Sequence, residues 1–405
     1  MIKARVLSPH SREDIRQEIG KIGADKAGRE IMVNKGQFFL IKVYNVPLKG
    51  AILIKQEMLS KGGEAAVARE VGSLTPDRSD LLLMGTLKQF RLFIKKLKLQ
   101  PFQLKEVARE LEEALGKYNR HHFLGDKREN LLYLGDKTFK LGERTLIMGI
   151  LNVTPDSFSD GGEFFDLDRA LEHARAMVKE GIDILDIGGE STRPQAEPIS
   201  EEEELRRVMP LLEKLTGELE VPISIDTYKA PVAEKALKLG AQMVNDVWGL
   251  KADPELAEVA ARYQVPVCLM HNRKKARYND LMTEVTDDLR ESVNIALKAG
   301  VKEENIILDP GIGFGKTLEH NLGVMYHLEE VVAMGYPLLL GTSRKSMIGK
   351  VLDLPAGERL EGTASTIAYG ITRGVDIVRV HDIKYMKRVV DMTDAMVRRP
   401  QQVLD

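Results

Sequence analysis

Eight short apolar runs in the second part of the chain each end in residues that can do chemistry. A lone Asp after such a run is usually the cap of the next helix, and this interpretation stays open for Asp246 and Asp382. Capping does not account for polar groups after all eight runs, so we expect these groups to meet in one site. The residues at the ends are Asn152, Asp186, Asp226, Asn245, Met270 with His271, Asp309, Lys345 with Ser346, and Arg379 with His381.

One subset suits a flat heterocycle that has amide and amino edges. A buried carboxylate can accept two parallel N–H bonds from such a ring, and this recognition is strong because the bonds are charge-assisted. The subset comprises Asp226, Asn245, Asp309 and Lys345.

A second subset suits an anionic phosphate group. The Arg fork matches phosphate oxygens, and a neutral Asn oxygen can bind Mg²⁺ while phosphate completes the coordination shell. This subset comprises Asn152, Arg193, Arg379 and His381, with Asn152 as the metal ligand.

Ser346 marks a third anion position, because it lies at the expected start of a helix over Ser346–Leu352, where a carboxylate is stabilised. No Ser-His-Asp or Cys-His nucleophile set is evident. The residue types therefore favour transfer of a group from a good leaving group over covalent catalysis.

These residues require strands that place their carboxyl ends together. The apolar runs alternate with amphipathic helical stretches, which predicts right-handed βαβ units and a parallel sheet. Eight such units predict a closed (β/α)8 barrel of the α/β class over residues 136–405, with the site at its C-terminal face. An open doubly wound sheet is the alternative, but no GxGxxG follows the first run. The expected strands are Thr145–Leu151, Ile184–Ile187, Pro222–Ile225, Gln242–Val244, Pro266–Met270, Ile306–Leu308, Pro337–Leu340 and Asp376–Val380.

Residues 1–135 predict a small α+β domain of unknown role. Strands are expected from Gln37, over Ala51–Ile54 and near Leu81, and helices over Ala65–Val71, Thr86–Leu97 and Leu104–Tyr118. Residues 1–136 hold 25 basic against 17 acidic residues, whereas residues 137–405 hold 34 against 44. This asymmetry is too weak to predict a nucleic-acid partner, and we expect an appendage that packs on the barrel.

The composition predicts a soluble cytoplasmic enzyme. The chain has 405 residues, 43% of them hydrophobic, and no signal peptide or apolar run of membrane-spanning length. Its one cysteine, Cys268, excludes an intrachain disulfide, and its apolar run favours a buried strand residue over a nucleophile.

The motifs together resemble the dihydropteroate synthase family of the pterin-binding barrels. They are MGILNVTPDSFSDGG, LDIGGESTRP, ISIDT, NDV, DPGIGFGK, GTSRKS and RVHD, which span Thr145 to Asp382 in the family's order. The resemblance covers none of residues 1–135. It implies condensation of 6-hydroxymethyl-7,8-dihydropterin diphosphate with p-aminobenzoate, with Mg²⁺ as cofactor. It also implies that the chain forms a homodimer and that its partners are small molecules, not nucleic acid or a membrane.

The resemblance also implies a role for each site residue. It assigns the pterin to Asp226, Asn245, Asp309 and Lys345, with Met270 beside them. It assigns the diphosphate to Asn152, Arg379 and His381, with Asn152 near Mg²⁺. It assigns p-aminobenzoate to Phe158, Thr192, Arg193, Pro194, Phe314, Lys345 and Ser346.

The mechanism implied by the resemblance is dissociative, so pyrophosphate leaves before the amine attacks. Asp226 would stabilise the resulting cation, and Asp160 would assist it. The loops Asn152–Phe165 and Gly188–Ile199 are expected to close over the site and exclude water. Gln195 departs from the family's usual Gly and is expected to alter closure of the second loop without removing activity.

Two other functions remain as alternatives. A methyltetrahydrofolate methyltransferase would recognise a pterin in the same way, but it has no use for the anion-binding set. A non-catalytic pterin-binding protein would not need the complete set of strand-end residues. The sequence also leaves open whether the amine is p-aminobenzoate or a larger arylamine.

Overall fold

The computed structural model describes residues 2–7, 9, 12–122, 131–153, 163–191 and 197–398. The chain divides into two compact units, Met1–Asp126 and Lys127–Asp405. The expected boundary after residue 135 lies in the turn of a hairpin that belongs to the second unit. No helix among the described residues is long and apolar enough to cross a membrane.

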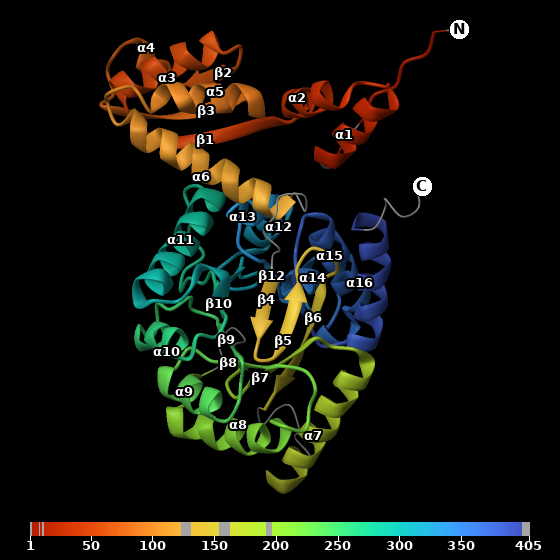
Figure 1. Cartoon of the computed structure of the whole chain (residues 1–405). Coiled ribbons are helices and arrows are strands. Elements are labelled where there is room, and N and C mark those ends of the chain that lie inside the picture. Colours follow the sequence, from red (N-terminus) through yellow and green to blue (C-terminus); the bar gives the residue numbers. More distant parts are fainter. Residues whose placement is uncertain are drawn as a thin grey trace. The chain divides into compact units, whose positions relative to one another are not determined.

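The first unit is an α+β domain built on an antiparallel sheet of three strands in the order β1-β3-β2 (Figure 1). Its core is formed by apolar residues of β1, β3 and the helices α3, α5 and α6, including Phe90 and Phe93. Its elements are α1 (Arg12–Lys21), α2 (Lys26–Gly36), β1 (Phe38–Pro47), α3 (Leu48–Ser60), β2 (Glu64–Val67), α4 (Arg69–Gly72), β3 (Arg78–Thr86), α5 (Leu87–Leu97) and α6 (Leu104–His122).

Two expectations for this unit were wrong in detail. The run Ala51–Ile54 is not a strand but part of α3, because Ala51, Ile54 and Met58 recur at helical spacing and are fully buried along one face. Ala65–Val71 is not one helix: β2 ends at Val67 and the short α4 follows. Pairing of β2 with β3, for example Ala65 with Leu83, overrides the helical preference of this stretch.

The second unit is an eight-stranded parallel barrel, and this confirms the predicted fold class. The strands pair in the order β11-β10-β9-β8-β7-β6-β13-β12. A parallel bridge between Leu308 and Leu338 joins β11 to the chain entering β12 and closes the ring. The strands are β6 (Leu146–Asn152), β7 (Ile184–Gly188), β8 (Ile223–Asp226), β9 (Met243–Asp246), β10 (Val267–Met270), β11 (Ile306–Asp309), β12 (Leu339–Leu340) and β13 (Ile377–Val380).

Helices surround the barrel strands, as Figure 1 shows for α8 to α11 and α16. Their apolar faces pack on the outward-facing strand residues in one continuous core. The helices are α7 (Glu163–Glu180), α8 (Glu201–Leu215), α9 (Ala230–Lys238), α10 (Glu255–Tyr263), α11 (Leu281–Ala299), α12 (Leu318–Tyr326), α13 (Leu328–Val332), α14 (Ser346–Leu352), α15 (Leu360–Thr372) and α16 (Ile383–Val397).

A hairpin of β4 (Leu131–Leu134) and β5 (Lys137–Lys140) packs against the N-terminal end of the barrel. Its Leu132 and Leu134 are fully buried in one cluster with residues that begin the strands, such as Leu146 and Ile184. Because this end is filled by apolar side chains, the chemistry must lie at the C-terminal end, where the polar residues were expected.

Candidate active site

An arginine between two carboxylates forms the centre of the site. Arg379 of β13 donates from Nε to Asp186 Oδ2 at 2.6 Å and from Nη2 to Asp226 Oδ2 at 2.7 Å. The carboxylates come from β7 and β8, and both are buried. Asn245 of β9 adds a bond from Nδ2 to Asp186 Oδ2 at 3.1 Å. Four strands thus join their inward-facing polar groups in one network.

This network leaves acceptors without a partner. Asp186 Oδ1, Asp226 Oδ1 and the Ser224 hydroxyl are buried and have no hydrogen-bond partner among the described residues. Burial raises the pKa of Asp226, while the charge of Arg379 opposes that rise. Buried polar groups in proteins are almost always satisfied, so these oxygens indicate a ligand that brings N–H donors.

The loop after β11 forms a second part of the site. The Gly311 amide donates to Asp309 Oδ1 at 2.7 Å and holds that carboxylate in place. Lys345, which precedes α14, donates from Nζ to Ile312 O at 2.8 Å, and its ammonium lies 4.0 Å from the centre of the Phe314 ring. Burial lowers the pKa of Lys345 to about 8 and raises that of Asp309.

Asn152 ends β6 beside Gly188, its partner in the parallel pairing. A Cβ atom on Gly188 would lie 3.5 Å from Asn152 Oδ1 and 3.4 Å from the Asp226 Cβ, both ordinary contact distances, so these two side chains border the same position. Among the described residues no three His, Cys, Asp or Glu side chains gather as a metal site. The side-chain oxygen of Asn152 is of the kind that Mg²⁺ takes as a ligand.

His381 follows β13, and its Nδ1 lies 2.9 Å from the hydroxyl of Ser343 in the loop after β12. The same loop is linked to the next one by Arg344, whose Nε donates to Asp382 at 3.0 Å. Asp382 stands at the N-cap of α16, but its side chain makes this ion pair and no cap bond. Asp246 accepts from the amides of Trp248 at 2.8 Å and Leu250 at 2.5 Å, so it stabilises the turn after β9. It does not cap a helix, because the N-cap of the next helix, α10, is Pro254.

The structure describes most of the expected site residues. It places Asp226, Asn245 and Asp309 buried at or next to the C-terminal ends of β8, β9 and β11, with buried Met270 at the end of β10. Arg379 is half-buried within β13, and Lys345 is half-buried directly before α14. Ser346 is exposed as the first residue of α14. Cys268 is fully buried, and burial raises the pKa of its thiol well above the usual value, as expected for a structural residue. Phe158, Asp160, Thr192, Arg193, Pro194 and Gln195 lie outside the described residues.

Two groups at the site went unassigned in the sequence. Asp186 was noted at a strand end but was given no role, although an acidic residue inside the buried run Ile184–Gly188 was a usable signal. Lys316 was also missed. Its Nζ lies 2.6 Å from Nδ1 of His271, which is 2% exposed, and no sequence pattern pairs these two residues.

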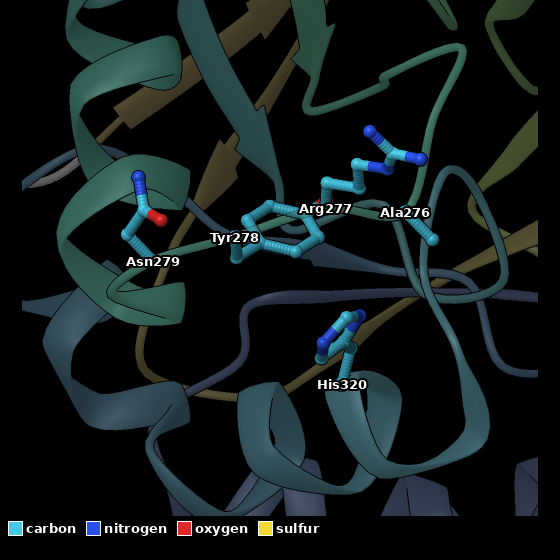
Figure 2. Close-up of a pocket in the computed structure, with 5 residues that line it drawn as sticks. All are labelled: Ala276, Arg277, Tyr278, Asn279 and His320. Atoms are coloured by element: carbon cyan, nitrogen blue, oxygen red, sulfur yellow. The ribbon is translucent and has the colours of Figure 1, made fainter.

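A pocket of about 440 Å³ lies on the other side of the loop after β11, next to α12. Figure 2 shows Tyr278 and His320 next to each other there, while the Arg277 guanidinium points away from them. The centroids of the two rings are 4.9 Å apart, and the rings meet edge to face. The Tyr278 hydroxyl donates to Gly315 O at 2.8 Å. None of the buried carboxylates lines this pocket, so we do not place the chemistry in it.

Comparison with known proteins identifies relatives of the barrel unit. The profile of the family "Pterin binding enzyme" matches residues 148–381. Dihydropteroate synthase from Bacillus subtilis (strain 168) is 60% identical over 257 residues, which cover 64% of this chain and 90% of that protein. A crystal structure of FolP (dihydropteroate synthase) from Clostridium difficile, in the presence of pteroic acid, is 56% identical with a TM-score of 0.64. That match covers 64% of this chain and 100% of the other.

One relative also matches the first unit. A probable bifunctional folylpolyglutamate synthase/dihydropteroate synthase from Halobacterium salinarum is 40% identical over 392 residues, covering 95% of this chain and 46% of that protein. This alignment is longer than Lys127–Asp405, so it includes much of Met1–Asp126. The first unit is therefore not peculiar to this chain.

Proposed function

The chain belongs to the pterin binding enzyme family, and within it to the dihydropteroate synthases, transferases of folate synthesis; from this premise we propose its substrates and the role of each residue. The substrates are 6-hydroxymethyl-7,8-dihydropterin diphosphate and p-aminobenzoate. The products are 7,8-dihydropteroate and pyrophosphate. The observation that carries this proposal is the pair of unpartnered carboxylate oxygens of Asp186 and Asp226 beside the Arg379 guanidinium.

The pterin ring is bound by the unpartnered acceptors. Its amino and ring N–H groups donate to Asp226 Oδ1, and Asn245 and Asp309 line the same interior surface. Lys345 contributes its ammonium beside the ring. Burial raises the pKa of Asp226 to about 7 even though the positive charge of Arg379 opposes the rise, so Asp226 is ionised above that pH. An ionised Asp226 is the form that accepts two N–H bonds.

The diphosphate is bound where β6 and β13 end. Two of the five N–H donors of Arg379 are used by the carboxylates, so others remain for phosphate oxygens. His381, oriented by Ser343, lies two residues after Arg379. Asn152 would supply one oxygen ligand to Mg²⁺, which when bound offsets the negative charge of the leaving group.

Transfer begins when the bond between the pterin methylene carbon and the diphosphate oxygen breaks, and the electron pair leaves with pyrophosphate. The cation left on the methylene carbon is stabilised by Asp226 in a low-dielectric interior. The p-aminobenzoate nitrogen then forms the new C–N bond and loses a proton. We assign the amine substrate to the side of Phe314, Lys345 and Ser346.

The test is pyrophosphate release by the purified full chain with the pterin diphosphate and Mg²⁺. Release that requires p-aminobenzoate, together with formation of dihydropteroate, is the expected result. Binding of the pterin without turnover, with p-aminobenzoate or with larger arylamines, would overturn the proposed reaction. Omission of Mg²⁺ tests the metal separately, and activity that persists in a chelator would remove Asn152 from its role as a ligand.

Two further expectations belong to the proposal. The chain is a homodimer, and it acts in the cytoplasm. Sedimentation equilibrium of the full chain tests the homodimer directly, and a single species of monomer mass would contradict it.

A further inference from the structure

The loop after β11 determines where the Lys345 ammonium lies. Ile312 O accepts the hydrogen bond from Lys345 Nζ at 2.8 Å, and Phe314 presents its ring to the same ammonium at 4.0 Å. Both contacts depend on the path of the loop backbone. A change in that path would therefore move the Lys345 charge relative to the substrates.

This backbone path is demanding. Gly311, Gly313 and Gly315 have φ values of 67°, 86° and 54°, a region that side chains other than glycine rarely adopt. The loop is also pressed against the segment that follows β10. A Cβ on Gly311 would lie 1.8 Å from His271 O, and one on Gly315 would lie 2.3 Å from Arg273 O. Glycine-rich backbone loses much conformational entropy on folding, so a specific interaction is needed to hold it.

The Lys316 ammonium supplies that interaction. Its Nζ donates to Gly311 O at 3.0 Å and to Phe314 O at 3.3 Å, and lies 2.6 Å from His271 Nδ1. Burial lowers the pKa of Lys316 to about 7, so the ammonium form predominates below that pH. An ammonium has three donors, and all three find acceptors here. The loop thus curls around the Lys316 ammonium, which also contacts His271, the residue after β10.

His271, the residue after β10, is the third acceptor. Burial lowers the pKa of His271 to about 4, so its ring is neutral near pH 7. With Nδ1 accepting from Lys316, the ring proton is on Nε2, which lies 3.1 Å from Asp288 Oδ2 but has no hydrogen-bond partner among the described residues. Asp288 accepts instead from Arg273 Nε at 2.6 Å. The hydrogen bonds therefore run from His271 through Lys316 to the glycine loop.

We propose that Lys316 is a positioning residue that folds the glycine loop around its ammonium and thereby places Lys345 and Phe314 against the amine substrate. It does not itself contact substrate. Asp226 and Asn245 depend on other strands, whereas Phe314 belongs to the glycine loop and Lys345 contacts it. Loss of Lys316 therefore affects the amine side of the site more than the pterin side, where only Lys345 and Asp309 are linked to this loop. This inference rests on the proposed function for the identity of the ligands.

The test is a double-mutant cycle on binding of dihydropteroate by the full chain, measured by titration calorimetry. Lys316→Met removes all three donors and keeps the apolar stem. We expect it to weaken binding about tenfold alone, and by less than about threefold when Lys345→Ala is already present, because residues that act through one another are not additive. Lys298→Met, on an exposed face of α11, is the matched control and leaves binding unchanged.

A steady-state measurement separates positioning from a general loss of structure. Lys316→Met is expected to raise KM for p-aminobenzoate about tenfold and to change KM for the pterin diphosphate less than threefold. Equal changes in both KM values, or additive effects in the binding cycle, would overturn the proposal. If Lys316→Met does not fold, His271→Leu takes its place, because it removes one of the three acceptors of Lys316. The double-mutant cycle with Lys345→Ala is then repeated with His271→Leu, and a smaller but again non-additive loss of dihydropteroate binding is expected. Absence of dihydropteroate binding by the unmodified chain would instead contradict the proposed function.

Discussion

Replacing Arg379 by Met tests the central network of the site most directly. The substitution keeps an apolar stem of similar length and removes two charge-assisted hydrogen bonds, to Asp186 and to Asp226. The side chains of these carboxylates are 0% and 5% exposed, so both would be left in the interior without their cation. Breaking a buried ion pair on one side costs roughly 3–5 kcal/mol. Because Arg379 is 18% exposed and water can reach its position, we expect a loss of about 3 kcal/mol in the free energy of unfolding.

The pH dependence of this loss tests the role of Arg379 more specifically than the size of the loss does. A carboxyl whose pKa is raised in the folded state binds its proton more tightly there, so the free energy of unfolding falls as pH rises from the unfolded pKa of about 3.9 to the folded pKa. Arg379 lowers the folded pKa of Asp226, so its removal extends this fall to higher pH. Because the folded pKa of Asp226 is about 7 in the unmodified protein, the stability difference between the unmodified protein and the variant is expected to widen as pH rises above about 7.

Urea unfolding followed by tryptophan fluorescence measures this loss in the barrel alone. Trp248 is the one tryptophan of the chain and lies directly after β9. Arg175→Met is the matched control, because Arg175 makes two similar bonds to Glu218, but both partners are solvent-exposed; we expect little change from it. An Arg379→Met variant that unfolds like this control, with a stability difference that does not vary with pH, would refute the reasoning.

Three further outcomes follow from the barrel. Lys345→Ala is expected to nearly abolish turnover while the fluorescence transition stays cooperative, and near-normal kcat/KM would contradict its place in the site. Gly311→Ala is expected to destabilise the barrel and lower kcat, since its Cβ would lie 1.8 Å from His271 O, a backbone atom that has no rotamer to change; an unaltered urea midpoint would count against this close approach. The fragment 127–405 is expected to be soluble and cooperative in circular dichroism melting, whereas 137–405 lacks the β4 leucines that fill the barrel end and should melt lower; equal melting temperatures would rule out that role for the hairpin.

The barrel could be predicted from the sequence because the same strand–helix pattern repeats along the chain. Parallel strands covered on both faces are continuous apolar runs, and eight of them alternating with helices leave few other arrangements. The first unit lacks this redundancy. The four residues Ala51–Ile54 have the composition of a strand, and only the longer spacing to Met58 shows the buried helical face. The pairing of β2 with β3 depends on residues distant in the chain, which local propensity does not encode.

The site was predictable as a set of strand ends but not as a network. Asp186 and Arg379 are 193 residues apart in the sequence. Neither motif indicates that the Asp186 carboxylate accepts a hydrogen bond from the Arg379 guanidinium. The same holds for Lys316 and His271, 45 residues apart. Sequence identifies which side chains point into the barrel, whereas the choice of partners depends on the packing of all eight strands.

The hydrogen bonds among the site residues have a consequence for the mechanism that could not be inferred from the residue types alone. Arg379 binds the carboxylate assigned to the pterin, and it lies two residues before His381, which is assigned to the diphosphate. On the proposed assignments, this guanidinium bonds to the carboxylate that stabilises the developing cation and offers its remaining donors to the leaving anion. When pyrophosphate departs, Arg379 remains bonded to Asp186 and Asp226, so it stays in position without a phosphate to hold it. The buried ion network therefore keeps the site organised through the step at which its largest charge is lost.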